Sequence, residues 1–194
     1  MQSLVRGVSV RSVPPRNSKL NSLLPDRADR MDAEIRVEPL DHQSTSTARQ
    51  IHAVQVLAYT QEAQLLGADA FPPLMRSVGE VRSSEEAFLG AFVRDELVGA
   101  VSVGPDENGV DLCIASLVVA PEWQQQGVGA SLIEAVVAQY GTKDLTVQTG
   151  VKNLPALRLY ARYGFAEICR WLVGREPLEL IKLRRPAKGV KHAA

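Results

Sequence analysis

The feature that most constrains the fold is a glycine-containing segment, Gln124-Gln125-Gln126-Gly127-Val128-Gly129-Ala130. It follows an apolar run at 114–119 and precedes an amphipathic run that ends at Tyr140. This order predicts a strand, a loop and a helix. Because the first turn of a helix has unpaired N–H groups and the positive end of the helix dipole, such a segment is suited to bind phosphate. A tight turn before a helix is the alternative interpretation of this segment taken alone.

A second motif begins at Asn153, which opens a predicted helix. The motif continues through four further residues, Leu159, Tyr160, Gly164 and Phe165. Together the two motifs resemble the GNAT superfamily, the acyl-CoA-dependent N-acetyltransferases. The pyrophosphate loop of that family has the pattern Gln/Arg-x-x-Gly-x-Gly/Ala, which is matched here by Gln124, Gly127 and Gly129. The resemblance covers residues 34–184 and is strongest over 97–170.

The resemblance implies a binding site for acetyl-CoA as co-substrate. Main-chain groups of Leu117 and Val119 would pair with the pantetheine arm, and Asn153 would contact it. The Gln124 side chain would assist at the pyrophosphate, which would be held by the main-chain N–H groups of Gln125, Gln126, Gly127, Val128, Gly129 and Ala130. Tyr160 would be the catalytic residue, protonating the departing thiolate, because a phenol has a pKa suited to that transfer.

Each of these residues also has a purely structural interpretation. Leu117 and Val119 fit a core strand, and the glutamines fit a solvated loop. Asn153 fits a helix N-cap, and Tyr160 fits a ring packed in the core. Tyr163, its neighbour, is interpreted as a core residue.

The general base is not identified by the motifs. Asp111 lies near the start of the strand before the glycine loop, where an exposed structural carboxylate is the simpler interpretation. Glu62, Asp69 and Glu85 are alternatives, as is a water held by Ser116.

The hydrophobic pattern predicts an α/β fold of the α+β type with a single mixed, mostly antiparallel sheet of about seven strands flanked by helices. The resemblance implies that this fold is GNAT-like. The expected strand before the glycine loop runs parallel to the strand after its helix. A helix is expected from Ala48 to about Thr60, followed by an irregular segment at 61–84 that shapes the acceptor pocket in the resembled family.

The ends of the chain are expected to be disordered. Residues 1–33 form an N-terminal extension without periodicity, residues 34–184 form the acetyltransferase domain, and residues 185–194 form a tail. Met31 is an alternative start site, in which case residues 1–30 are not part of the native protein.

Composition narrows the classes of partner. Aromatic residues make up only 5% of the chain, which gives little support for base stacking, so no nucleic-acid partner is expected. The net charge of zero combines basic ends with an acidic middle, which favours a cationic substrate such as an amine.

No apolar run is long enough to span a membrane. His42, His52 and His192 have no ligand spacing, so no metal is expected. Cys113 and Cys169 are interpreted as reduced core residues of a cytoplasmic protein.

These observations favour an N-acetyltransferase that transfers an acetyl group from acetyl-CoA to a primary amine of a small molecule by direct attack in a ternary complex. A protein N-terminal or lysine acetyltransferase and a non-catalytic CoA-binding regulatory module are the alternatives. A homodimer is compatible with the sequence. A P-loop nucleotide site is excluded because no lysine follows Gly129.

Overall fold

The structure is a computed structural model that describes residues 34–68, 71–174 and 177–188. The predicted extension at 1–33 and residues 189–194 of the predicted tail lie outside these residues. The described elements, in chain order, are β1 (Ile35–Leu40), α2 (Thr45–Leu66), η1 (Pro72–Met75), α3 (Val78–Arg82), β2 (Ala87–Val93), β3 (Glu96–Pro105), β4 (Leu112–Val119), η2 (Pro121–Trp123), α4 (Val128–Tyr140), β5 (Leu145–Gly150), α5 (Leu154–Arg162), β6 (Ala166–Val173) and β7 (Leu178–Arg185).

The strands form one sheet of seven in the order β1-β2-β3-β4-β5-β7-β6. Every neighbouring pair is antiparallel except β4 and β5, which are parallel. The predicted fold class, the seven strands and the parallel pair are therefore confirmed.

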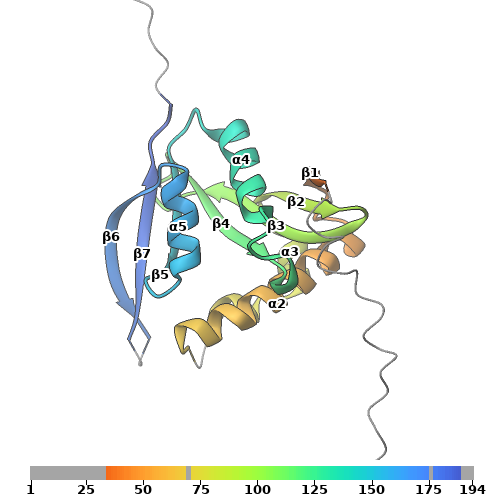
Figure 1. The fold of residues 1–194 in the computed structure, drawn as a ribbon, viewed down its shortest axis with the longest axis horizontal. Helices are drawn as coiled ribbons and strands as arrows, with labels where there is room; N and C mark the ends of the chain where they lie inside the picture. The colour runs from red at the N-terminus through yellow and green to blue at the C-terminus, as the bar shows by residue number, and fades with distance from the viewer. Residues whose placement is uncertain (1–33, 69–70, 175–176, 189–194) are drawn as a thin grey trace, which may run out of the picture. The chain divides into compact units, whose positions relative to one another are not determined.

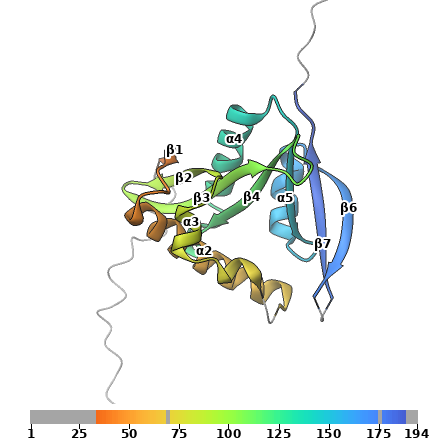
Figure 2. The same cartoon turned by 180° about the vertical axis from the view of Figure 1, so that it is seen from behind.

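Helices cover both faces of the sheet (Figures 1 and 2). On β4, Ser116 bonds to Tyr59 and Gln55 of α2, whereas the Val119 side chain lies next to Gly129 of α4. Residues separated by an odd number of positions point to opposite faces of a strand. The two helices therefore pack on opposite faces, and α5 lies on the same face as α4 (Figure 1).

The expectation for residues 61–84 is wrong in two respects. First, α2 continues to Leu66 because Gln61 to Leu66 contains no helix breaker and Ala63 and Leu66 are buried. Gly67 then ends the helix in the left-handed conformation, with a φ of 68°, and its N–H bonds back to the last turn.

The second difference is a short helix, α3, inside the segment that was expected to be irregular. Its N-terminus is a capping box in which the Ser77 hydroxyl accepts from the Glu80 N–H and Glu80 accepts from the Ser77 N–H. The Ser-x-x-Glu spacing was a detectable signal for this helix.

The prediction that both cysteines are core residues is wrong for Cys169, which is exposed on the edge strand β6, while Cys113 on β4 is half-buried. Both are free thiols. After β7, the Ala187 N–H donates to Asp144 and the Lys188 N–H donates to the Gly141 carbonyl, so this part of the predicted tail is bound to the domain.

Charged side chains hold the sheet together at the start of β4 and β5, where an ionic cluster is formed by Asp106, Asp111, Asp144, Lys182 and Arg184. Lys182 Nζ lies 2.8 Å from Asp106 Oδ1, and the Thr146 hydroxyl donates to Asp106 Oδ2 at 3.0 Å. Arg184 pairs with both Asp111 and Asp144. The ionic cluster therefore joins the loop after β3 to β5 and β7.

Among the described residues, no helix is long and apolar enough to cross a membrane. Nor does that part of the chain contain a group of three or more His, Cys, Asp or Glu side chains placed to hold a metal ion.

Candidate active site

The site begins with a gap between the parallel strands β4 and β5. Their pairing covers only Leu112–Ile114 with Leu145–Val147. Next to the last paired residue, the register of β3 and β4 shifts between Ser102 and Val103, which leaves Ala115 as a bulge. A bulge bends its strand and increases the local twist. Beyond it, β4 diverges from β5 and leaves one edge without a neighbouring strand.

Main-chain groups of Leu117 and Val119 face this gap. The Ala120 N–H bonds to the Val98 carbonyl at 2.9 Å and therefore points toward β3. Successive residues turn their main-chain groups to alternate sides of a strand. Those of Val119 and Leu117 consequently point away from β3, toward the gap.

The glycine-containing loop lies at the end of β4 and leads into α4. Gly127 is the N-cap residue, with a φ of 90°, and Gln125 also has a positive φ of 61°. The first N–H of the helix to bond back is that of Ser131, to the Gly127 carbonyl at 2.9 Å. No side chain caps this terminus. The N–H groups ahead of Ser131 are thus available to an anion.

The glutamine side chains of this loop differ in their contacts. Gln124 donates to the Val119 carbonyl at 3.2 Å and to Gln61 of α2. Gln126 donates to the Glu122 carbonyl at 2.7 Å, and Gln125 is exposed. Gln124 therefore lies beside the open edge of β4, whereas the Gln126 amide stabilises the loop itself.

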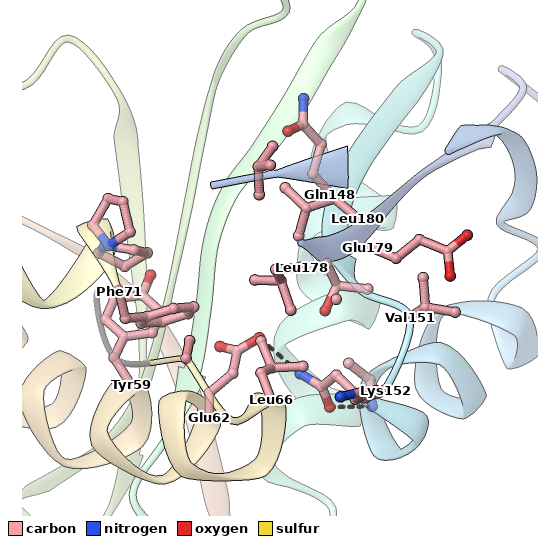
Figure 3. Close-up of a pocket in the computed structure, with 18 of the residues that line it drawn as sticks. Tyr59, Glu62, Leu66, Phe71, Gln148, Val151, Lys152, Leu178, Glu179 and Leu180 are labelled. Atoms are coloured by element: carbon pink, nitrogen blue, oxygen red, sulfur yellow. Dashed lines mark hydrogen bonds between the residues drawn. The ribbon is translucent and has the colours of Figure 1, made fainter. Parts of the chain in front are cut away.

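A cavity of about 1300 Å³ opens where β4 and β5 separate. It is lined by β4, β5, the last turns of α2, the segment through η1, the start of α5 and the ends of β6 and β7. Figure 3 shows Glu62 between Leu66 and the aromatic pair Tyr59 and Phe71, with Leu178 across the cavity. Although α2 and α5 pack on opposite faces of the sheet, their side chains meet through this gap.

Asn153 makes the contact that joins the two helices. Its Oδ1 accepts a hydrogen bond from the Ala156 N–H at 3.2 Å and so caps α5. Its Nδ2 donates to Glu62 Oε1 at 2.9 Å (Figure 3, dashed line). Burial raises the pKa of Glu62, and the hydrogen bond from Asn153 only partly offsets this effect.

Tyr160 lies on α5 with its side chain in the wall of the same cavity. Its exposed fraction is 4%, and its ring packs against Phe165 at a centroid distance of 5.6 Å. Burial raises the pKa of Tyr160 well above its usual range, and the nearby Glu62 raises it further. Tyr59 faces the cavity from α2, hydrogen-bonds to Ser116 at 2.7 Å, and has a pKa raised to about 12, chiefly by burial.

The candidates for the general base differ in whether they face the cavity. Asp111 is buried rather than exposed and is ion-paired with Arg184 in the ionic cluster, outside the cavity lining. Glu85 is exposed and also outside that lining. Asp69 lies outside the described residues, and Ser116 bonds to Tyr59 and Gln55. Of the described carboxylates considered, Glu62 is the one that faces the cavity together with Tyr160. The motifs did not single it out, because α2 was expected to end before it.

The arrangement is suited to bind an extended ligand that has an anionic group at one end. The open edge of β4 can pair with an extended chain, and the N-terminus of α4 can bind an anionic group at one end of that chain. A phenol and a carboxylate lie in the cavity that the gap opens into.

Comparison with known proteins gives a consistent result. Residues 50–165 match the Acetyltransferase (GNAT) family. The UPF0157 protein YqkA of Bacillus subtilis (strain 168) is 34% identical over 130 residues, which are 66% of this chain and 37% of that protein. The chain therefore spans little more than a third of this relative.

A second relative, the aminoglycoside N(6')-acetyltransferase type 1 of Stenotrophomonas maltophilia, is 31% identical over 147 residues, covering 70% of this chain and 96% of that protein. Among solved structures, the ribosomal-protein-S18-alanine N-acetyltransferase of Escherichia coli superimposes with a TM-score of 0.64 at 16% identity, covering 83% of this chain and 99% of that one. At this identity the match shows the shared fold.

Proposed function

Because the chain belongs to the Acetyltransferase (GNAT) family and is therefore an N-acetyltransferase, we propose that it acetylates a primary amine of a small molecule. The donor is acetyl-CoA, and the transfer is direct, within a ternary complex. The observation that carries this proposal is the gap between β4 and β5, with an uncapped helix N-terminus at one end and Tyr160 and Glu62 in its cavity.

The donor is held mainly by main-chain groups. The pantetheine arm pairs with Leu117 and Val119 along the open edge of β4, as a peptide pairs with an unoccupied sheet edge. The pyrophosphate binds the N–H groups from Gln125 to Ala130, where the helix dipole favours negative charge. Gln124 and Asn153 flank the arm, since Gln124 bonds to the Val119 carbonyl and Asn153 lines the cavity.

In the chemical step, the amine nitrogen forms a bond to the thioester carbonyl carbon and the carbon–sulfur bond breaks. Tyr160 donates the proton that the departing thiolate needs. Its hydroxyl is protonated at neutral pH, as a general acid requires, and burial raises its pKa further. Direct transfer is supported by the positions of Cys113 and Cys169, because neither lines the cavity where an acyl-enzyme would form.

A small molecule, as distinct from a protein, is supported as the acceptor by the relative from Stenotrophomonas maltophilia, whose name gives an aminoglycoside as its substrate; the match covers 96% of that protein and 70% of this chain. A cytoplasmic location is part of the proposal and is supported by the two free thiols.

The proposal is tested by measuring thiol release from acetyl-CoA with a panel of amines, together with acetyl-CoA affinity by calorimetry. Turnover with free amines supports it. Turnover with peptide N-termini or lysine side chains alone transfers the activity to the protein-acetylating class, and binding without any turnover indicates a regulatory module.

The proposed binding of the pyrophosphate at the glycine-containing loop can be tested by substitutions at Gly127. In the Gly127→Glu variant, a carboxylate lies where the pyrophosphate approaches, so acetyl-CoA affinity falls at least tenfold, about 1.4 kcal/mol. Gly127→Gln is the matched control, because it carries the same backbone strain at a φ of 90° and nearly the same bulk without the charge. Calorimetry on both folded variants isolates the electrostatic contribution. Equal affinities for the two would show that the pyrophosphate binds elsewhere.

A further inference from the structure

The cavity also defines the acceptor, and this inference rests on the proposed function. We propose that Glu62 binds the ammonium group of the acceptor and removes its proton, and that the acceptor is a monoamine with an apolar body rather than a polycation.

Glu62 is placed and oriented for this role. It lies in the last turn but one of α2, half-buried in the cavity wall. The hydrogen bond from Asn153 engages Oε1 at 2.9 Å, and Oε2 has no partner among the described residues. One oxygen is therefore fixed by the protein while the other is available to an ammonium group in the cavity. Tyr160 lines the same cavity, so the base and the acid face one space.

Glu62 and Tyr160 together account for every proton that is transferred. The bound ammonium gives one proton to Glu62, and the neutral nitrogen then attacks the carbonyl carbon. As the carbon–sulfur bond breaks, Tyr160 protonates the sulfur and recovers a proton from the nitrogen, which keeps its third hydrogen as the amide N–H. The products are an amide, a free thiol and one proton that leaves through Glu62. Because burial raises the pKa of Glu62, it is a stronger base than an exposed carboxylate.

The walls around Glu62 are apolar. From the side of α2 and η1 they are formed by Leu66, Phe71 and Pro72, and from the side of β6 and β7 by Leu172, Leu178 and Leu180. Figure 3 shows Leu66 and Phe71 facing Leu178 and Leu180 across the cavity. Transfer of an apolar group attached to the amine from water to the space between these walls is favourable.

The charges around the cavity match a single cation. Of the described lining residues, Glu62 and Glu179 carry carboxylates and Lys152 carries the opposite charge. The Glu179 side chain is 48% exposed and lies 3.9 Å from Arg170, so Glu62 is the inner anionic site. An additional ammonium group of a polyamine that lies against the apolar walls would be desolvated without a partner there, which is unfavourable.

The first arm of the experiment compares acceptors at a fixed acetyl-CoA concentration, with thiol release as the readout. The probes are 2-phenylethylamine and n-hexylamine as apolar monoamines, spermidine and kanamycin as polycations, and a short peptide with a free N-terminus. We expect kcat/KM for the monoamines to exceed that for the polycations at least tenfold. A polycation or the peptide as the preferred acceptor would overturn the inference and leave acetyl transfer intact.

The second arm compares Glu62→Gln with Glu85→Gln. The amide introduced by Glu62→Gln retains an oxygen that accepts the bond from Asn153, so the fold is preserved, whereas Glu85 is exposed and does not line the cavity. We expect kcat/KM for 2-phenylethylamine to fall at least 100-fold in Glu62→Gln and to change less than twofold in Glu85→Gln, with unchanged acetyl-CoA affinity and melting temperature in both. Full activity of Glu62→Gln would overturn the inference alone. A wild-type protein that does not bind acetyl-CoA, or that releases no thiol with any amine, would overturn the proposed function and with it the inference.

Discussion

Replacing Tyr160 with phenylalanine is expected to lower kcat about 10²–10⁴-fold, the usual contribution of a positioned general acid. The substitution removes one hydroxyl and keeps the ring that packs against Phe165. Among the described residues the hydroxyl has no hydrogen-bond partner, so its loss should leave the melting temperature nearly unchanged. Acetyl-CoA affinity should also be unchanged, because the proposed donor site uses mainly main-chain groups. Steady-state kinetics with an amine that turns over, combined with calorimetry, measure both quantities.

Tyr163→Phe is the matched control, one turn away at the end of the same helix. The Tyr163 hydroxyl donates to Glu134 at 2.7 Å and does not line the cavity. This variant should retain kcat within about twofold, since it loses one surface hydrogen bond of about 1 kcal/mol. Unchanged kcat in Tyr160→Phe, with chemistry shown to limit the rate, would mean that another group protonates the thiolate.

Asp106→Asn is expected to destabilise the fold by about 3 kcal/mol, because it leaves the Lys182 ammonium without its partner in a buried position. The side chains of Asp106 and Lys182 are 3% and 13% exposed, and Asp106 also accepts bonds from Thr146 and the Glu107 N–H. Urea unfolding at pH 7 measures the difference in free energy. Asp95→Asn, in the exposed turn between β2 and β3, should change the stability by less than about 0.5 kcal/mol.

The Asp106–Lys182 pair also makes the stability of the fold depend on pH in the acidic range. Burial alone would raise the pKa of Asp106, but the hydrogen bonds from Lys182, the Glu107 N–H and Thr146 outweigh it and lower the pKa below 3.8. A carboxylate with a lowered folded pKa contributes stability that is fully present above its unfolded pKa and is lost as the pH falls through the folded pKa. The stability difference between the wild-type protein and Asp106→Asn should therefore narrow below pH 3.8. A constant difference down to about pH 2 would show that the pair is not ionised in the native state.

The parts of the fold that were predicted from the sequence are those with strong local signals. Alternating strands joined by short polar turns identified the antiparallel strands, and the helix between two apolar runs identified the parallel pair β4 and β5. The Asn153 cap was predicted in the same way, because capping depends on residues three positions apart.

Contacts between distant segments could not be predicted in this way. The Glu62–Asn153 bond joins residues 91 positions apart, and its formation depends on how far α2 extends and on how widely β4 and β5 diverge. The exposure of Cys169 likewise depends on the position of β6 at the edge of the sheet. Local patterns give no information about either, so the base was left among several carboxylates and Cys169 was assigned to the core.

The short pairing between β4 and β5 has a consequence for alignment within the enzyme. One block, β1 to β4 with α4, carries the glycine-containing loop, and the other, β5 to β7 with α5, carries Tyr160. The two blocks are joined along the sheet by three residue pairs and by the ionic cluster at their closed end. In the proposed site, a small rotation of one block about this end would produce a larger displacement of the Tyr160 hydroxyl relative to the thioester. Since a misplacement of about 1 Å can cost about 100-fold in rate, we expect substitutions in the ionic cluster, which does not line the cavity, to affect the rate of transfer.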